Sequence, residues 1–174
     1  MVLRAVDGVE PTIHEDAYVD DAAVVIGDVT LEPDASVWPN ATLRGDQPIV
    51  IREGANVQDN AVCHEDAVVG RHATVGHTAI VHAATVEERA LVGMGAIVLD
   101  DATVGERAIV AAGSVVTEGT DVPPETLVAG TPAEVIKEIP DSSWQEAADH
   151  YVEKADLYAG TSTVVEDEER TGSD

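Results

Sequence analysis

The sequence repeats an aliphatic residue every six positions through most of its length. A period of six fits neither an α-helix, with its period of 3.6, nor a free-standing strand, with its period of two. It fits a solenoid of short strands in which each hexad forms one flat side and a turn. The expected inward positions form three runs, separated by an eight-residue and a five-residue step: Ile13, Val19, Val25, Leu31, Val37 and Leu43; Ile51, Val57, Cys63, Val69, Val75 and Val81; Val86, Val92, Val98, Val104, Val110 and Val116.

Three hexads complete one triangular coil, so the repeat predicts an all-β parallel β-helix of about six coils. Adjacent coils should stack at about 4.8 Å, the spacing of hydrogen-bonded strands. We assign residues 1–133 to this domain, although the repeat fades after Val116. The Pro- and Gly-rich segment 122–133 is expected to be an exit loop.

The remaining residues predict a helix and a tail. Residues 134–159 form a connector and a helix that Asp141 or Ser142 can cap and that ends near Ala159. Its apolar stripe should pack back along one side of the solenoid and comprises Trp144, Ala147, Ala148, Tyr151, Ala155 and Tyr158. Residues 160–174 are rich in Thr, Ser, Glu and Asp, which favours disorder.

The charge excludes several kinds of partner. Nine basic residues face 34 acidic ones, a net charge of −25, and Lys137 and Lys154 are the only lysines. Binding to nucleic acid or to an anionic membrane needs a basic surface, so we expect neither. Few lysines, many acids and abundant alanine are typical of a halophilic archaeon with a salt-filled cytoplasm. We prefer this interpretation to an acidic interaction surface because the acids are spread along the chain, and it predicts stability that rises with KCl.

The chain lacks the signs of export. No apolar signal segment follows Met1 and no run is long enough to span a bilayer, so we expect a cytoplasmic protein. The single cysteine, Cys63, excludes an intrachain disulfide, and its inward position favours a small buried apolar side chain over a reactive thiol.

Three of the six histidines form a candidate metal site. His64 and His82 each follow an inward residue and are one coil (18 positions) apart, so they should stack on one outward face. Arg44 holds the equivalent position one coil earlier. His77 belongs to the preceding hexad and faces another side. His14, His72 and His150, by contrast, read as ordinary surface histidines.

Three imidazoles and a water form the usual open zinc site of an enzyme. One chain offers two ligands on one side and the third around a corner. His77 of one subunit can meet His64 and His82 of its neighbour if the solenoids pack with three-fold symmetry. The spacing therefore predicts a homotrimer with three equivalent interfacial metals.

The motifs resemble those of a known family. Trp38–Asn40, Leu43–Asp46, Asn56–Asp59, Cys63–His64, Val75–His77, Val81–His82 and Gly93–Ala96 look like the gamma-class carbonic anhydrases and their relatives, a resemblance that covers about residues 10–159. It implies a left-handed β-helix, a trimer and Zn2+ held by the three histidines, with Fe2+ or Co2+ as alternatives.

The resemblance also implies a reaction: a lyase that reversibly hydrates CO2 to bicarbonate by metal-bound hydroxide at the subunit interface. It assigns Gln58 to the hydroxide or bicarbonate, Arg44 and Asp46 to the interface beside the metal, and Asn56 and Asp59 to the pocket. Each has a plainer alternative, since Gln58 can satisfy backbone groups in a turn and Arg44 can be a structural partner of Asp46.

The sequence departs from the family pattern where the proton released by CO2 hydration would be exported. The acidic loop that the archetype inserts after its first ligand histidine is missing, and Gln47 stands where the archetype has Glu. Fast hydration needs proton export, so Glu65 or Asp66 would have to replace that loop. Two other functions stay open: an acyltransferase or acyl-CoA thioesterase, favoured weakly by Leu127–Pro132, which such transferases share, and a metal-binding structural subunit that lost the proton shuttle.

Overall fold

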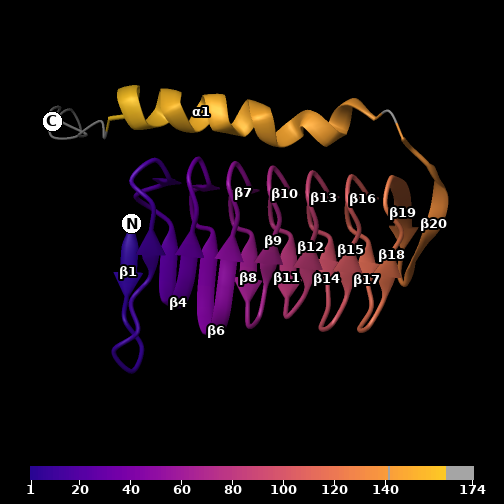
Figure 1. Ribbon diagram of the computed structural model, residues 1–174, viewed down its shortest axis with the longest axis horizontal. Coiled ribbons are helices and arrows are strands. Elements are labelled where there is room, and N and C mark those ends of the chain that lie inside the picture. The colour runs from indigo at the N-terminus through magenta and orange to yellow at the C-terminus, as the bar shows by residue number, and fades with distance from the viewer. Residues whose placement is uncertain (141, 164–174) are drawn as a thin grey trace, which may run out of the picture.

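The computed structural model describes residues 1–140 and 142–163 and shows a parallel β-solenoid with one helix alongside it (Figure 1). The predicted residues 164–174 of the tail lie outside this range. The solenoid has three faces. We name them the histidine face, the polar face and the helix face, by what each presents outward.

Each face is a ladder of short strands, one per coil. The histidine face contains β1 (Val2–Arg4), the first halves of β4 (Val24–Leu31) and β6 (Thr42–Ile51), β8 (Val62–His64), β11 (Ile80–His82), β14 (Ile97–Val98) and β17 (Val115–Val116). The polar face contains β2 (Thr12–Ile13), the second halves of β4 and β6, β9 (Val68–Val69), β12 (Thr85–Val86), β15 (Thr103–Val104) and β18 (Asp121–Val122). The helix face contains β3 (Tyr18–Val19), β5 (Ser36–Val37), β7 (Asn56–Val57), β10 (Thr74–Val75), β13 (Leu91–Val92), β16 (Ile109–Val110), β19 (Thr126–Gly130) and the antiparallel β20 (Ala133–Glu138).

The hexads set the register of these ladders. Inward residues of successive coils pair directly, as in Leu43 with Cys63 and Cys63 with Val81. The core is accordingly aliphatic, and from Val25 to Val116 every predicted inward residue is at most 1% exposed. Close packing of such side chains is the main stabilising contribution of a solenoid core.

The solenoid is longer than predicted. Val122 and Val128 are buried and continue the inward rows in β18 and β19, so the coils number about seven, and part of the expected exit loop is strand. The prolines and glycines of this segment lie between strands or at their ends, where a missing N–H or a turn is tolerated. β20 then folds back on β19 and covers the end of the stack.

The C-terminal helix runs back along the helix face (Figure 1). A 3-10 turn, η1 (Ser143–Glu146), begins at Ser142, whose side chain accepts from the Trp144 amide, and leads into α1 (Ala147–Thr161). Ala148 and Ala155 are buried, and the Tyr151 and Tyr158 rings pack edge-on against Trp38 of the solenoid. Trp144, predicted in the apolar stripe, is instead 67% exposed, because it lies in the 3-10 turn before α1 begins.

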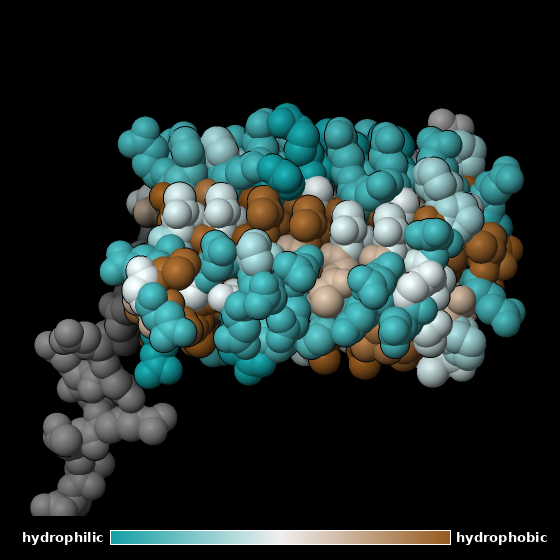
Figure 2. Space-filling view, turned by 60° about the horizontal axis from the view of Figure 1, so that its bottom comes forward, coloured by the Kyte–Doolittle hydropathy of each residue, from teal (hydrophilic) through white to brown (hydrophobic). Residues whose placement is uncertain are grey.

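Charged and apolar side chains occupy different parts of the surface. Figure 2 shows one side of the molecule, on which hydrophilic side chains flank a band of apolar and weakly polar ones along the solenoid. Ion pairs such as Arg52–Glu32 cross between coils on the polar face. Within the described residues, no helix is long and apolar enough to cross a membrane.

Candidate metal centre

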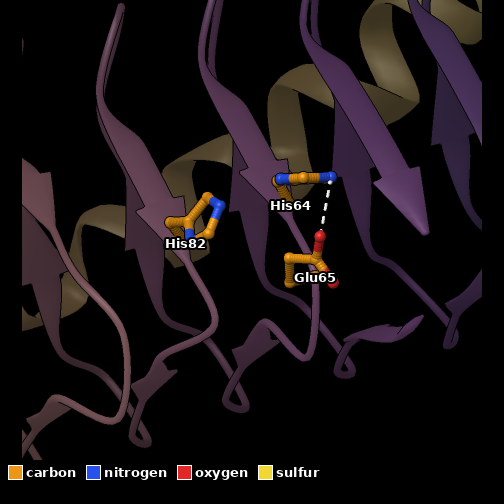
Figure 3. A group of neighbouring side chains, drawn as sticks. All are labelled: His64, Glu65 and His82. Atoms are coloured by element: carbon orange, nitrogen blue, oxygen red, sulfur yellow. Dashed lines mark ion pairs between the residues drawn. The ribbon is translucent and has the colours of Figure 1, made fainter. Parts of the chain in front are cut away.

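His64 and His82 lie side by side at the ends of β8 and β11. The two strands pair in parallel with His82 directly beside His64, and the ring centroids are 4.9 Å apart. Figure 3 shows both rings on the same side of neighbouring strands, with Glu65 beside His64. One ligand atom from each of these three residues lies within 4.8 Å of the others. The expected stacking of the two histidines is therefore present.

Each of the three predicted ligand histidines contacts a carboxylate one coil away, His64 through Nε2 and the other two through Nδ1. Asp100 accepts from Nδ1 of His82 at 2.6 Å, and Asp59 lies 2.9 Å from Nδ1 of His77. A carboxylate on Nδ1 orients the ring and leaves Nε2 free for a metal, the usual support of a metal-bound histidine. Asp59 was among the residues predicted for the pocket, whereas Asp100 was not predicted.

The Arg44–Asp46 pair contacts His64 directly. Asp46 Oδ2 lies 2.9 Å from Arg44 Nε and 2.9 Å from His64 Nε2. The hydrogen bond from His64 is the main reason that the pKa of the Asp46 carboxyl is lowered; partial desolvation opposes it and Arg44 reinforces it. Arg44 and Asp46 do form the expected pair, and their part in a subunit interface stays a prediction.

A glycine corner brings this pair into place. β4 and β6 pair around the corner through Gly27 and Gly45, where the register shifts. A Cβ on Gly27 would overlap the carbonyl of Gly45, and one on Gly45 would overlap the carbonyl of Asp28. Only glycine permits this approach, which is why Arg44 and Asp46 flank a glycine.

His77 lies away from the other two ligands, at the corner between the helix face and the histidine face. It follows β10 and precedes β11, and it is not in the group that His64, Glu65 and His82 form within one chain. The hydroxyl of Tyr151, on α1, is 3.5 Å from its Nε2. Tyr151 is half-buried, and burial, reinforced by Asp59, raises the pKa of its hydroxyl.

Gln58 and Asn56 form a buried polar chain behind His77. The His77 amide donates to Gln58 Oε1 at 3.1 Å, Gln58 Nε2 donates to Asn56 Oδ1 at 3.2 Å, and Asn56 Nδ2 donates to Thr74 Oγ1 at 3.0 Å. Within one chain, Gln58 thus satisfies a backbone group, which is the plainer of its two predicted roles. Its contact with bicarbonate stays a prediction.

The other histidines have local partners. His14 lies 3.5 Å from Asp16, and His72 lies 2.8 Å from Asp149 of α1. Asp149 also binds Arg89, so His72 helps to hold the helix on the solenoid. The ring of His150 packs edge-on near Tyr151.

The donor set suits a borderline metal ion. Two neighbouring imidazoles and a carboxylate beside them, with Asp100 on Nδ1 of His82, are ligands that zinc and ferrous iron accept. In the single chain, Nε2 of His64 is held by Arg44 and Asp46, so a metal would have to displace these contacts. Glu65 is the third donor within one chain, and an imidazole from a second chain would complete a three-histidine set.

Comparisons with known proteins identify the family. The family model described as bacterial transferase hexapeptide (six repeats) matches residues 83–118. A carbonic anhydrase of Geobacillus kaustophilus is 39% identical over 159 residues, 87% of each chain. The carnitine operon protein CaiE of Shigella flexneri is 38% identical over 146 residues, 81% of this chain and 74% of that protein.

A solved structure is also similar. The hexapeptide transferase family protein from Anaplasma phagocytophilum matches with a TM-score of 0.88 at 38% identity, over 90% of this chain and 98% of that one. Fold and site define a parallel β-solenoid of hexapeptide repeats that carries a histidine cluster. The chain belongs to the hexapeptide-repeat family, and its relatives include both a carbonic anhydrase and transferase-family proteins.

Proposed function

We propose that this protein is a metal-dependent carbonic anhydrase whose metal is held between two subunits of a homotrimer. The observation that carries the proposal is the stacked pair of His64 and His82, with Asp100 on Nδ1 of His82. The 39% identity to a carbonic anhydrase over nearly the whole chain supports it. His77, turned away from the pair, supplies the third imidazole from a neighbouring chain.

The surface around the pair supports such packing. The outward row of the histidine face is apolar and partly exposed in the single chain: Val62, Ile80, Ile97 and Val115. On the polar face, the equivalent row includes Thr85, Thr103 and Asp121 together with Val50 and Val68, so it is less uniformly apolar. An apolar row beside two candidate ligands favours the histidine face as the one that other subunits cover.

Several residues of the chain have distinct roles in the proposed hydration of CO2. A divalent metal held by the three imidazoles would lower the pKa of a bound water to about 7 and so supply a nucleophile for CO2. Asp100 and Asp59 hold the rings of His82 and His77. The Arg44 guanidinium favours the bicarbonate anion by charge, and the Glu65 carboxylate, 3.4 Å from His64 Nε2, can accept the released proton.

The test is CO2 hydration measured by stopped flow in molar KCl, on protein loaded with zinc or, without oxygen, with ferrous iron. The His77→Ala variant should lose activity and metal, whereas His14→Ala, which removes a histidine whose partner is the nearby Asp16, should keep both. Activity that survives in His77→Ala would contradict the proposal. So would one bound metal per chain without hydration.

Acyl transfer or thioester hydrolysis is the second candidate function. The family model and the Anaplasma phagocytophilum structure both carry the transferase name. Acetyl-coenzyme A turnover in the same preparation, unchanged by His77→Ala, would favour it over CO2 hydration. Metal binding without either activity would favour a structural subunit.

A further inference from the structure

A groove runs between the helix face of the solenoid and the C-terminal segment. It is enclosed by the β13 and β16 region on one side and by β20, η1 and α1 on the other. Its volume is about 930 Å³, at the upper end of the roughly 300–1,000 Å³ that small-molecule sites occupy. One end of the groove, lined by His77 and Gln58, adjoins the proposed subunit interface, and the rest runs along the helix face toward β20.

The lining is mainly apolar and includes large side chains that nothing in the single chain covers. Leu91, Ile109 and Leu127 come from the outward row of the helix face. Met94 is 59% exposed and Trp144 is 67% exposed, although both border the groove. Contact with a hydrocarbon chain would remove this surface from water.

Both lysines of the chain line the groove. Lys137 and Lys154 are the only two lysines of a chain with net charge −25, and both line it. Neither forms an ion pair with a carboxylate of residues 1–140 or 142–163, and Lys154 Nζ instead lies 5.0 Å from the centre of the Tyr151 ring. Five arginines do pair with carboxylates: Arg44, Arg52, Arg71, Arg89 and Arg107.

Acidic residues are scarce in the groove. Among its described lining residues, Glu146 is the one acid, while His77 and His150 add two imidazoles to the two lysines. In a protein with 34 acidic residues, this is a local reversal of charge. Ammonium groups that have no carboxylate partner among residues 1–140 and 142–163, beside an apolar wall, are suited to a ligand with a negative head and a hydrocarbon chain.

We propose that this groove binds an amphipathic anion: an aliphatic chain of about eight to ten carbons that carries a carboxylate or phosphate head. The chain lies along Leu91, Ile109 and Trp144, and the head pairs with Lys137, which stands beside Leu127 at the β20 end of the groove. Lys154, over the Tyr151 ring, adds positive charge toward the other end. The groove shares His77 with the proposed metal site, but its lysines are not proposed ligands, so loss of anion binding and loss of CO2 hydration can be measured separately.

Calorimetric titration of the full-length protein tests the site. The probes are decanoate, decyl phosphate and, as the cationic control, decyltrimethylammonium, each below its micellar concentration. We expect one anionic probe or both to bind in preference to the cation, despite the overall negative charge of the protein. The ratio of the two anionic affinities then identifies the head group.

Variants distinguish binding of the anion in the groove from a nonspecific effect of the protein's charge. The double variant Lys137→Gln, Lys154→Gln should weaken the anionic probe by about tenfold or more, since each charge-assisted hydrogen bond contributes about 1.5–3 kcal/mol. Arg4→Gln removes one exposed positive charge outside the groove and should leave the affinity unchanged. Circular dichroism checks that each variant folds.

Three outcomes would overturn the proposal: no heat with either anionic probe, equal binding of the cationic probe, or wild-type affinity in the double lysine variant. Trp144→Phe provides a second check, because Trp38 is buried and Trp144 lines the groove. Probe-induced changes in tryptophan fluorescence should vanish in that variant, and their persistence would place the ligand elsewhere.

Discussion

The Asp100 carboxylate accepts a hydrogen bond from Nδ1 of His82 at 2.6 Å, across one coil of the solenoid. This contact fixes which ring nitrogen of His82 is free for a metal. Removing such a carboxylate from a metal-bound histidine usually weakens metal binding by about 10–100-fold. We therefore expect Asp100→Asn to bind zinc about 10–100-fold more weakly, measured by competition with a chromogenic chelator.

The neighbouring acid provides the control. Asp101 is exposed, lies in the turn after Asp100 and has a φ of 58°, which asparagine also accommodates. Asp101→Asn should keep wild-type zinc affinity. Equal affinities for the two variants would show that Asp100 does not support the ligand.

An interfacial site makes a quantitative prediction about mixed subunits. His64→Ala and His77→Ala chains should each assemble without intact sites, because every interface lacks one imidazole. Co-refolded at equal amounts, they should regain about one quarter of the wild-type metal per chain, since an intact site needs one specific arrangement of neighbours in a cyclic trimer.

Metal content of the separate and co-refolded samples measures this recovery. No recovery in trimers that mass spectrometry shows to be mixed would place all ligands within one chain. A matched mixture of His64→Ala and His82→Ala should recover nothing, because both ligands come from the same subunit in the proposed arrangement.

The apolar row of the histidine face should control assembly. Ile97 and Thr103 occupy equivalent outward positions in β14 and β15, on the histidine and polar faces. Ile97→Glu would bury a charge in the proposed interface and should shift the protein from trimer to monomer, whereas Thr103→Glu should not. Sedimentation in molar KCl distinguishes these results, and two trimeric variants would contradict the use of this face.

The solenoid was predictable because its core repeats at a fixed period. Register, inward residues and the stacking of His64 with His82 all follow from counting hexads. The additional coil escaped prediction because prolines and glycines around Val122 and Val128 resemble a loop, whereas burial of the two valines continues the strands. A count of inward positions alone would have included both.

The site was predicted less completely. Asp59 and Asp100 contact His77 and His82 because aspartates stand one coil away from each histidine, a spacing present in the sequence. The hydrogen bonds of Gln58 depend on how side chains pack under the helix, which no spacing reveals. The groove likewise depends on where β20 and α1 return along the solenoid.

Cys63 provides a test of the core beside the metal centre. It is fully buried between Leu43 and Val81, and burial raises the pKa of its thiol to about 12. We expect no reaction with a disulfide reagent in the native protein at pH 8 and full reaction after unfolding in urea, because the thiolate is the reactive form. Fast labelling of the native protein would show that the core opens.

The same burial predicts how stability depends on pH. A thiol whose pKa is raised on folding keeps its proton in the native state, whereas the unfolded thiol loses it above its ordinary value of 9.0. Unfolding therefore releases a proton between pH 9 and 12, and the free energy of unfolding falls as pH rises through this range. Cys63→Val keeps an apolar side chain at the position and abolishes this titration. Urea unfolding at pH 8 and 10.5 should thus show a larger loss of stability in the wild type than in Cys63→Val; equal losses would contradict a buried, neutral thiol.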